Sequence, residues 1–242
     1  MYNHAVIGGD LQLPKDLGCL RPSTKSCTSL FKHDAHAPGV YLEFARADLS
    51  DTDCARSRVN ALSNAKRALH WQAEALTDAL GFRRWPRARP KHFPSRLEFL
   101  SECLLVTPAI LKKLNTLRNE VEHRYVVPER GTLEDYVDVV ELYLTSSDPL
   151  VGAFPDLHEF YVSGEQGRQY CLCTTRHSGV IRVYQADWRS CLRASSEAGG
   201  STAEGESVSS DESIPSAIEF ADVASDPTRY FRLAQLFLGR LG

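Results

Sequence analysis

The residues with the clearest capacity for chemistry lie in the stretch RNEVEHRY, residues 118–125. His123 can accept and release a proton near neutral pH, because the unperturbed pKa of histidine is about 6.5. Arg118 carries a permanent positive charge, and its planar guanidinium can bind two phosphate oxygens at once. Asn119 lies one turn before the histidine and could orient the imidazole. Together these residue types could bind a phosphate and move a proton beside it.

The same stretch belongs to a predicted helix that runs from Thr107 to about Tyr125. At 100° per residue, its apolar arc is formed by Ile110, Leu114, Leu117, Val121 and Tyr125. An adjoining polar arc of roughly 140° holds Asn115, Arg118, Asn119, Glu122 and His123. Such a polar face is typical of a helix that lines a cleft or a subunit interface. The alternative is an ordinary exposed pair of Arg118 and Glu122, with His123 near the negative end of the helix dipole.

Three further predicted helices would position this one. The first begins near Leu49, ends before Gly81, and has two candidate N-caps, Asp51 and Asp53. The second opens at Ser95, and the last opens at Gly131, where a capping box is expected from Thr132 and Asp135. Short connections between these helices predict an antiparallel bundle over residues 48–146.

The pattern Arg118-Asn119-x-x-x-His123-x-Tyr125 resembles the signature of the HEPN superfamily, in which an R-x4-6-H motif lies on a late helix of a four- or five-helix bundle. Its R-x4-H-x-Y form resembles that of HEPN toxins paired with minimal nucleotidyltransferase antitoxins. The resemblance covers about residues 48–146, including ALSNAKRALHWQAEALTDALG of the first helix. The spacing alone is unspecific, since Arg87 and His92 share it. The asparagine, the tyrosine and the helical context carry the match.

This resemblance implies a metal-independent endoribonuclease that uses the 2′-hydroxyl of the RNA and needs no cofactor. It also implies a homodimer in which both motifs face one composite active site, with Arg118, Asn119 and His123 as catalytic residues. Tyr125 matches the tyrosine to which related antitoxins attach adenylate groups, so it is a candidate regulatory site. A role as a toxin or phage-defence effector, with a cognate nucleotidyltransferase antitoxin as partner, is implied in the same way.

Two acidic neighbours of the motif, Glu120 and Glu122, leave a second interpretation open. Their carboxylates would repel a phosphate unless they are paired. The alternative function is a catalytically inactive HEPN dimer that serves as a nucleotide- or protein-binding module through the same cleft.

The most basic segment of the chain is FRRWPRARPKHFP, residues 82–94, whose three prolines exclude a regular helix. We expect a connecting loop, whose cations could contact an RNA backbone while Trp85 and Phe93 stack on bases. The candidate RNA-binding residues are Arg83, Arg84, Arg87, Arg89, Lys91 and Arg96. The alternative is a solvated loop that is anchored by its two aromatic rings.

The rest of the sequence predicts an α+β protein, in which the bundle is followed by a small antiparallel β-sheet and a C-terminal helix. Alternating β-branched and aromatic residues place the sheet at residues 150–192. A flexible acidic linker rich in Ser, Gly and Glu is expected over residues 193–214, and a strand and helix over 215–242. Within the N-terminal segment, residues 1–47, one strand is expected at residues 39–45.

Composition bears on metals, redox state and location. Cys171 and Cys173 on one side of a strand, flanked by His158 and His177, raise the question of zinc, but a C-x-C in a strand more often packs as two small apolar side chains. We therefore expect no metal. An odd number of cysteines, seven, favours reduced thiols. The net charge of -3 requires any RNA binding to be local. The sequence shows no export signal or long apolar run, which predicts a cytoplasmic protein without membrane association.

Overall fold

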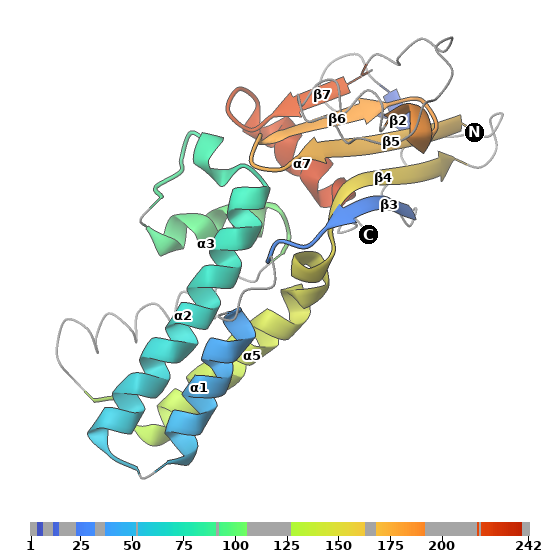
Figure 1. Cartoon of the computed structure of the whole chain (residues 1–242). Coiled ribbons are helices and arrows are strands. Elements are labelled where there is room, and N and C mark those ends of the chain that lie inside the picture. Colours follow the sequence, from blue (N-terminus) through green and yellow to red (C-terminus); the bar gives the residue numbers. More distant parts are fainter. Residues whose placement is uncertain are drawn as a thin grey trace. The chain divides into compact units, whose positions relative to one another are not determined.

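The structure, a computed structural model, is a mixed assembly of helices and antiparallel strands, so the predicted α+β class is confirmed (Figure 1). It describes residues 4–6, 12–14, 23–31, 37–51, 53–90, 92–105, 127–162, 168–191, 217 and 219–238. The chain divides into a helical unit, residues 29–78 and 87–154, and a sheet unit, residues 1–28, 79–86 and 155–242. No helix within the described ranges is long and apolar enough to cross a membrane.

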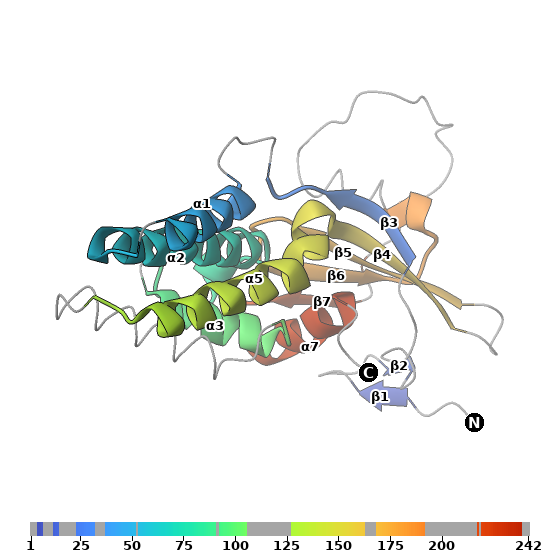
Figure 2. The same ribbon diagram turned by 90° about the horizontal axis from the view of Figure 1, so that it is seen from below.

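The helical unit is built from α1 (Pro38–Ser50), α2 (Ala55–Ala79), α3 (Phe93–Glu102) and α5 (Arg130–Gly152). Helix α1 runs opposite to α5. The end of α1 lies at the start of α5, where Arg130 donates to the Leu49 carbonyl. Helices α2 and α5 run the same way. Near their starts Arg58 donates to Pro128 O, and near their ends Gln72 donates to Leu144 O (Figures 1 and 2).

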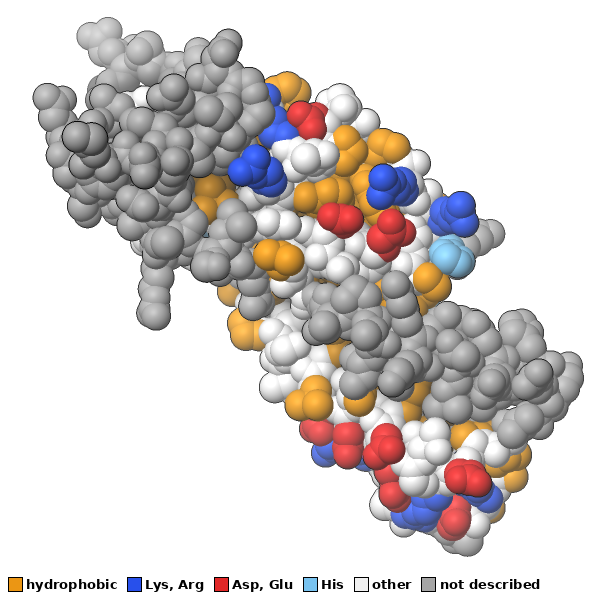
Figure 3. All heavy atoms as spheres, turned by 180° about the vertical axis from the view of Figure 1, so that it is seen from behind, with side chains coloured by type: hydrophobic (Ala, Val, Ile, Leu, Met, Phe, Trp, Pro, Cys, Tyr) orange, Lys and Arg blue, Asp and Glu red, His pale blue; other side chains and the backbone are white. Residues whose placement is uncertain are grey.

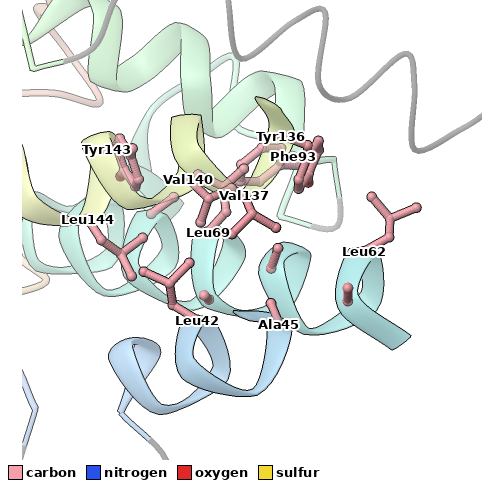
Figure 4. Packing of buried hydrophobic residues seen from close by; sticks show 14 of the residues in the cluster. Leu42, Ala45, Leu62, Leu69, Phe93, Tyr136, Val137, Val140, Tyr143 and Leu144 are labelled. Atoms are coloured by element: carbon pink, nitrogen blue, oxygen red, sulfur yellow. The ribbon is translucent and has the colours of Figure 1, made fainter. Parts of the chain in front are cut away.

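Small residues on α2 let its neighbours pack closely. Ala61, Ala65, Ala68 and Ala73 are completely buried in a core that also contains Leu42 of α1, Leu97 of α3 and Val140 of α5 (Figure 4). The polar side chain of Gln72 is also buried in this region, and its Nε2 donates to the buried Ser147 Oγ at 2.7 Å. Because its donor is satisfied, Gln72 links α2 to α5 without the cost of an unpaired buried group.

Three sequence expectations about these helices are wrong. Residues 39–45 form part of helix α1 rather than a strand. Leu42, Ala45 and Leu49 recur at a helical spacing, which seven residues alone are too few to reveal. The predicted first helix begins at Ala55 rather than near Leu49, and Cys54 takes the capping position expected for Asp51 or Asp53, since its Sγ accepts from Ser57 N at 3.4 Å. Helix α5 has no side-chain cap, so the predicted capping box is absent.

The sheet unit contains a five-stranded sheet in the order β3-β4-β5-β6-β7, where the pairs from β4 to β7 are antiparallel (Figure 1). The strands are β3 (Ser23–Thr28), β4 (Phe154–Val162), β5 (Arg168–Thr175), β6 (Val180–Tyr184) and β7 (Glu219–Asp222). Two short strands, β1 (His4–Val6) and β2 (Gln12–Pro14), form a separate antiparallel pair. The antiparallel sheet expected after the bundle is therefore present.

Strand alternation gives the sheet two distinct faces. Helix α7 (Pro227–Phe237) packs on the face that carries His158, where the Phe237 ring lies 4.9 Å from the imidazole. We call the opposite side the cysteine face. It carries an apolar cluster of Leu157, Cys171, Cys173, Tyr184 and Cys191, against which Ala186 and Trp188 pack.

The end of α2 meets the β5–β6 turn inside the sheet unit. Gly81 has a positive φ of 79°, as expected for the residue after a helix, and a Cβ there would lie 2.2 Å from the Cα of Gly179. His177 N donates to Ala79 O at 3.0 Å across the same contact. Only glycines allow these two backbones to approach so closely.

The end of α3 yields a stability prediction. Leu104 has a φ of 56°, and the two hydrogen bonds from Leu104 N to Ser101 O and from Leu105 N to Leu100 O form a Schellman motif. A non-glycine residue in this region costs about 1 kcal/mol. Leu104→Gly should therefore raise the free energy of unfolding by about 0.5–1 kcal/mol in urea denaturation.

The matched control is the same substitution at Leu142, which is 69% exposed, against 50% for Leu104, but lies inside α5. Leu142→Gly should lower the free energy of unfolding by about 1 kcal/mol, because glycine is unfavourable in a helix interior. Changes of the same sign at both positions would contradict this account.

Candidate functional site

The residues of the predicted catalytic motif, Arg118, Asn119, His123 and Tyr125, lie outside the described part of the chain. The described residues on either side of positions 106–126 both belong to the helical unit. On one side Leu105 packs against the helical core, and on the other Pro128 is buried and accepts a hydrogen bond from Arg58 Nη1 at 3.2 Å. The motif segment is therefore joined at both ends to residues that contact the helical core.

The unit boundary divides the predicted basic RNA-binding segment. Arg83 and Arg84 belong to the sheet unit, whereas Arg87, Arg89 and Arg96 belong to the helical unit. Lys91 lies outside the described residues. Residues 82–84 form a short 3-10 helix, η2 (Phe82–Arg84), so this part is a turn rather than an open loop. The segment therefore contributes one group of arginines to the sheet unit and another to the helical unit.

Three of these arginines are exposed cations, as a surface that binds phosphates would require. Arg83 and Arg89 are exposed, and the side chain of Arg87 is 71% exposed with Glu98 at 3.7 Å. Arg84 is more constrained, because it donates to Ser178 O at 2.9 Å and to Asp222 Oδ2 at 2.8 Å. Its side chain is nevertheless 46% exposed, which leaves part of Arg84 accessible to a ligand from solution.

Arg96 is a structural residue, and its assignment to an RNA-binding surface is wrong. It lies in α3, and its side chain is only 4% exposed. The guanidinium donates to Asp78 Oδ1 at 2.8 Å and to Thr77 Oγ1. A buried guanidinium in this arrangement joins α3 to the end of α2 and is inaccessible to a phosphate.

The two aromatic residues of the segment are anchors rather than stacking platforms. Trp85 is 3% exposed and its ring meets that of Phe231 at 5.9 Å within the sheet unit. Phe93 is 6% exposed and stacks on His70 at 3.8 Å within the helical unit. The expectation that these rings stack on bases is therefore wrong, because no base could reach them.

The different roles of Arg96 and Arg87 can be tested by parallel substitutions. Arg96→Met should lower the free energy of unfolding by about 2–4 kcal/mol, because it removes the cation that pairs with Asp78 and the hydrogen bond that the guanidinium donates to the buried Thr77. Arg87→Met should change it by less than about 0.5 kcal/mol, since an exposed pair contributes little. Equal effects in urea denaturation would show that Arg96 has no structural role.

His158 is the described histidine that is most deeply placed in the sheet unit. It is 6% exposed, its Nδ1 lies 3.2 Å from Thr24 Oγ1, and burial lowers its pKa to about 4. A histidine with this pKa is neutral at physiological pH and serves packing. It cannot replace His123 as the proton-transfer group.

The pKa of His158 predicts a pH dependence of stability. Because the folded-state pKa of about 4 lies below the unfolded value of 6.5, the unfolded chain binds more protons between these values, and stability falls as the pH falls from 6.5 towards 4. The His158→Gln variant should lose on the order of 2–3 kcal/mol less than the wild type over this interval. Parallel losses in both proteins, measured by urea titration at each pH, would contradict a buried neutral imidazole.

The cysteines of the sheet pack together in the apolar cluster of the cysteine face. Cys171 and Cys191 both approach Ala186 O, at 3.4 and 3.9 Å. Hydrogen bonds with the neighbouring thiols of Cys171 and Cys173, together with burial, raise the pKa of Cys191. Nearby, the fully buried Glu159 is paired with Lys25 at 3.2 Å. Within the described ranges, no three His, Cys, Asp or Glu side chains gather in a way that could hold a metal ion.

Two residues that the sequence analysis did not single out lie on an accessible part of the sheet. Phe220 on β7 is 54% exposed, and Arg182 on β6 is its cross-strand partner. The only sequence signal was an aromatic residue in a four-residue strand, which is too short for a clear alternating pattern.

Comparison with known proteins supplies no relative: no family model, curated protein or solved structure matches the chain. The surface in Figure 3 shows acidic and basic side chains interspersed on the described part of that face, rather than a field of one sign.

Proposed function

We propose that the protein is a metal-independent endoribonuclease of the HEPN type that acts as a homodimer with a composite active site. The observation that carries the proposal is the Arg118-Asn119-x-x-x-His123-x-Tyr125 motif. His123 would transfer the proton to or from the reacting ribose and phosphate oxygens, and Arg118 would stabilise the charge of the phosphate during the displacement. Asn119 would orient the imidazole or bind the ribose.

The helical unit supports this proposal by its architecture. Its long helices share one apolar core with α3, and α3 and α5 flank the motif segment in the sequence. Rigid helices are better than loops at holding a guanidinium and an imidazole at a fixed separation, because packing restricts their backbones. The packed helices on either side of the motif segment in the sequence therefore support the proposal.

A biological role as a toxin or phage-defence effector is part of the same proposal. Tyr125 would then be the position at which a nucleotidyltransferase antitoxin blocks the site by attaching adenylate. Cleavage of cellular RNA would account for such a role without any cofactor.

A second function is favoured by Glu120 and Glu122, which add two negative charges beside the motif. If these carboxylates remain unpaired, they oppose phosphate binding. The protein would then be a catalytically inactive HEPN dimer that binds a nucleotide or a partner protein.

The experiment that separates these functions is RNA cleavage in the presence of EDTA. Wild-type protein should cut total RNA, and Arg118→Ala or His123→Ala should reduce the rate at least about 100-fold, because general acid–base catalysis typically contributes that much. Asn119→Ala should have a smaller effect. Matched controls are His92→Ala, in the second R-x4-H spacing, and the exposed Arg56→Ala, neither of which should alter the rate.

Intact RNA in every EDTA sample would favour the inactive binding module. Cleavage that survives His123→Ala would equally contradict the proposed chemistry, since the imidazole would then be dispensable.

A further inference from the structure

An exposed aromatic ring and a cation lie side by side at the β7 edge of the sheet. Phe220 is 54% exposed, and the register pairs it directly with Arg182 on β6. Residues directly opposite in an antiparallel pair have their Cβ atoms about 4.5–5.5 Å apart on the same face. The Phe220 ring and the half-buried Arg182 side chain therefore start from neighbouring Cβ atoms, close enough for the two side chains to touch.

Arg84 adds a second cation to this region. It binds Asp222 Oδ2 at 2.8 Å, and Asp222 lies two residues after Phe220 on β7. Residues at this interval share one face of a strand and are about 7 Å apart. Phe220 thus lies between Arg182 on the neighbouring strand and the guanidinium of Arg84 farther along its own strand. We call these three residues the edge cluster.

The local charge of the edge cluster is positive. Arg84 is paired with Asp222, which is only 16% exposed, whereas Arg182 makes no ion pair with any described side chain. None of the three cluster residues is acidic, and the carboxylate of Asp222 is mostly buried, so an anionic ligand would face little repulsion here.

The geometry points to the edge cluster as a contact surface for single-stranded RNA, in which a base stacks on Phe220 while Arg182 and Arg84 contact the adjacent phosphates. Exposed rings flanked by arginines are the arrangement that binds single strands irrespective of sequence. This inference rests on the proposed function for its RNA partner, and it joins Arg84 of the basic segment to the β7 edge of the sheet.

RNA fits the edge cluster better than a protein partner does. Of the described large hydrophobic side chains of the sheet unit, only Phe220 is largely exposed; the others belong to the helical unit. A stable protein interface buries about 800 Å² on each partner around several apolar anchors. A single ring beside cations offers too little apolar area for this purpose, but it is sufficient for one base.

The test measures binding of a fluorescein-labelled single-stranded RNA of about 12 nucleotides by anisotropy, with EDTA present and His123→Ala as the parent protein, so that the probe stays intact. Phe220→Leu should weaken binding roughly 5- to 100-fold, because leucine is apolar but cannot stack. Phe220→Trp should retain the affinity. Since the Phe220 side chain is exposed, both variants should keep the circular dichroism of the parent.

The arginines are distinguished from the ring by salt. Arg182→Gln should reduce the slope of log Kd against log salt concentration by about 0.7, the value for one phosphate contact of a single strand. Phe220→Leu should leave this slope unchanged. The controls are Arg232→Gln on α7, which packs on the opposite face of the sheet, and Phe44→Leu on α1, the exposed phenylalanine of the helical unit.

Affinities of Phe220→Leu and Arg182→Gln equal to those of the two controls would overturn the inference. The same holds if Phe220→Leu leaves RNA binding intact but changes the sedimentation of the free protein, because the cluster would then contact a second copy. If the wild type cleaves RNA but Phe220→Leu does not weaken RNA binding, the edge cluster is rejected and the nuclease proposal stands. If Phe220→Leu weakens RNA binding but the wild type does not cleave RNA, the nuclease proposal is rejected and the edge cluster stands.

Discussion

The close packing of α2 against α1 and α5 is the constraint on which the helical unit depends. Four completely buried alanines on α2 let neighbouring helices approach, and Gln72 provides a satisfied polar link to α5 inside this region. Dense packing of this kind leaves little freedom for helices to shift. A catalytic pair placed on such a scaffold could keep its separation without a metal ion to hold it.

The polar interactions of the two units show how charges are used in this chain. Arg96 and Glu159 are buried and paired, and they tie secondary-structure elements together. Arg83, Arg87 and Arg89 remain at the surface. Burial therefore separates structural cations from those that can meet a ligand, a distinction that counting arginines in the sequence cannot make.

Much of the fold could be predicted from the sequence, because it rests on local periodicity. The heptad-like leucines of α2, the apolar face of α5 and the alternating residues of β4, β5 and β6 each indicate their element within a short window. The expectation for residues 39–45 failed because seven residues with aromatic and β-branched members fit a strand as well as a helix. Strand β3 was missed because a short edge strand carries little alternation, whereas β7 lies within the strand and helix expected over residues 215–242.

The site was only partly predictable for a different reason. Residue types and spacing indicate what Arg118 and His123 could do, but the accessibility of Trp85, Phe93 and Arg96 depends on packing between segments far apart in the chain. The pairing of Phe220 with Arg182 depends likewise on sheet register, which brings together positions 38 residues apart in sequence (220 less 182). Long-range contacts of this kind leave no local signal.

The central claim concerns the nucleophile, since the proposed chemistry uses the 2′-hydroxyl of the RNA with His123 moving the proton. The most direct measurement maps the cleavage site in a defined RNA oligonucleotide and repeats the reaction with a single 2′-deoxy nucleotide immediately upstream of that bond. The account predicts that cleavage at that bond disappears and that the unmodified product ends in a 2′,3′-cyclic phosphate. Continued cleavage of the substituted bond, leaving a 5′-phosphate, would contradict it.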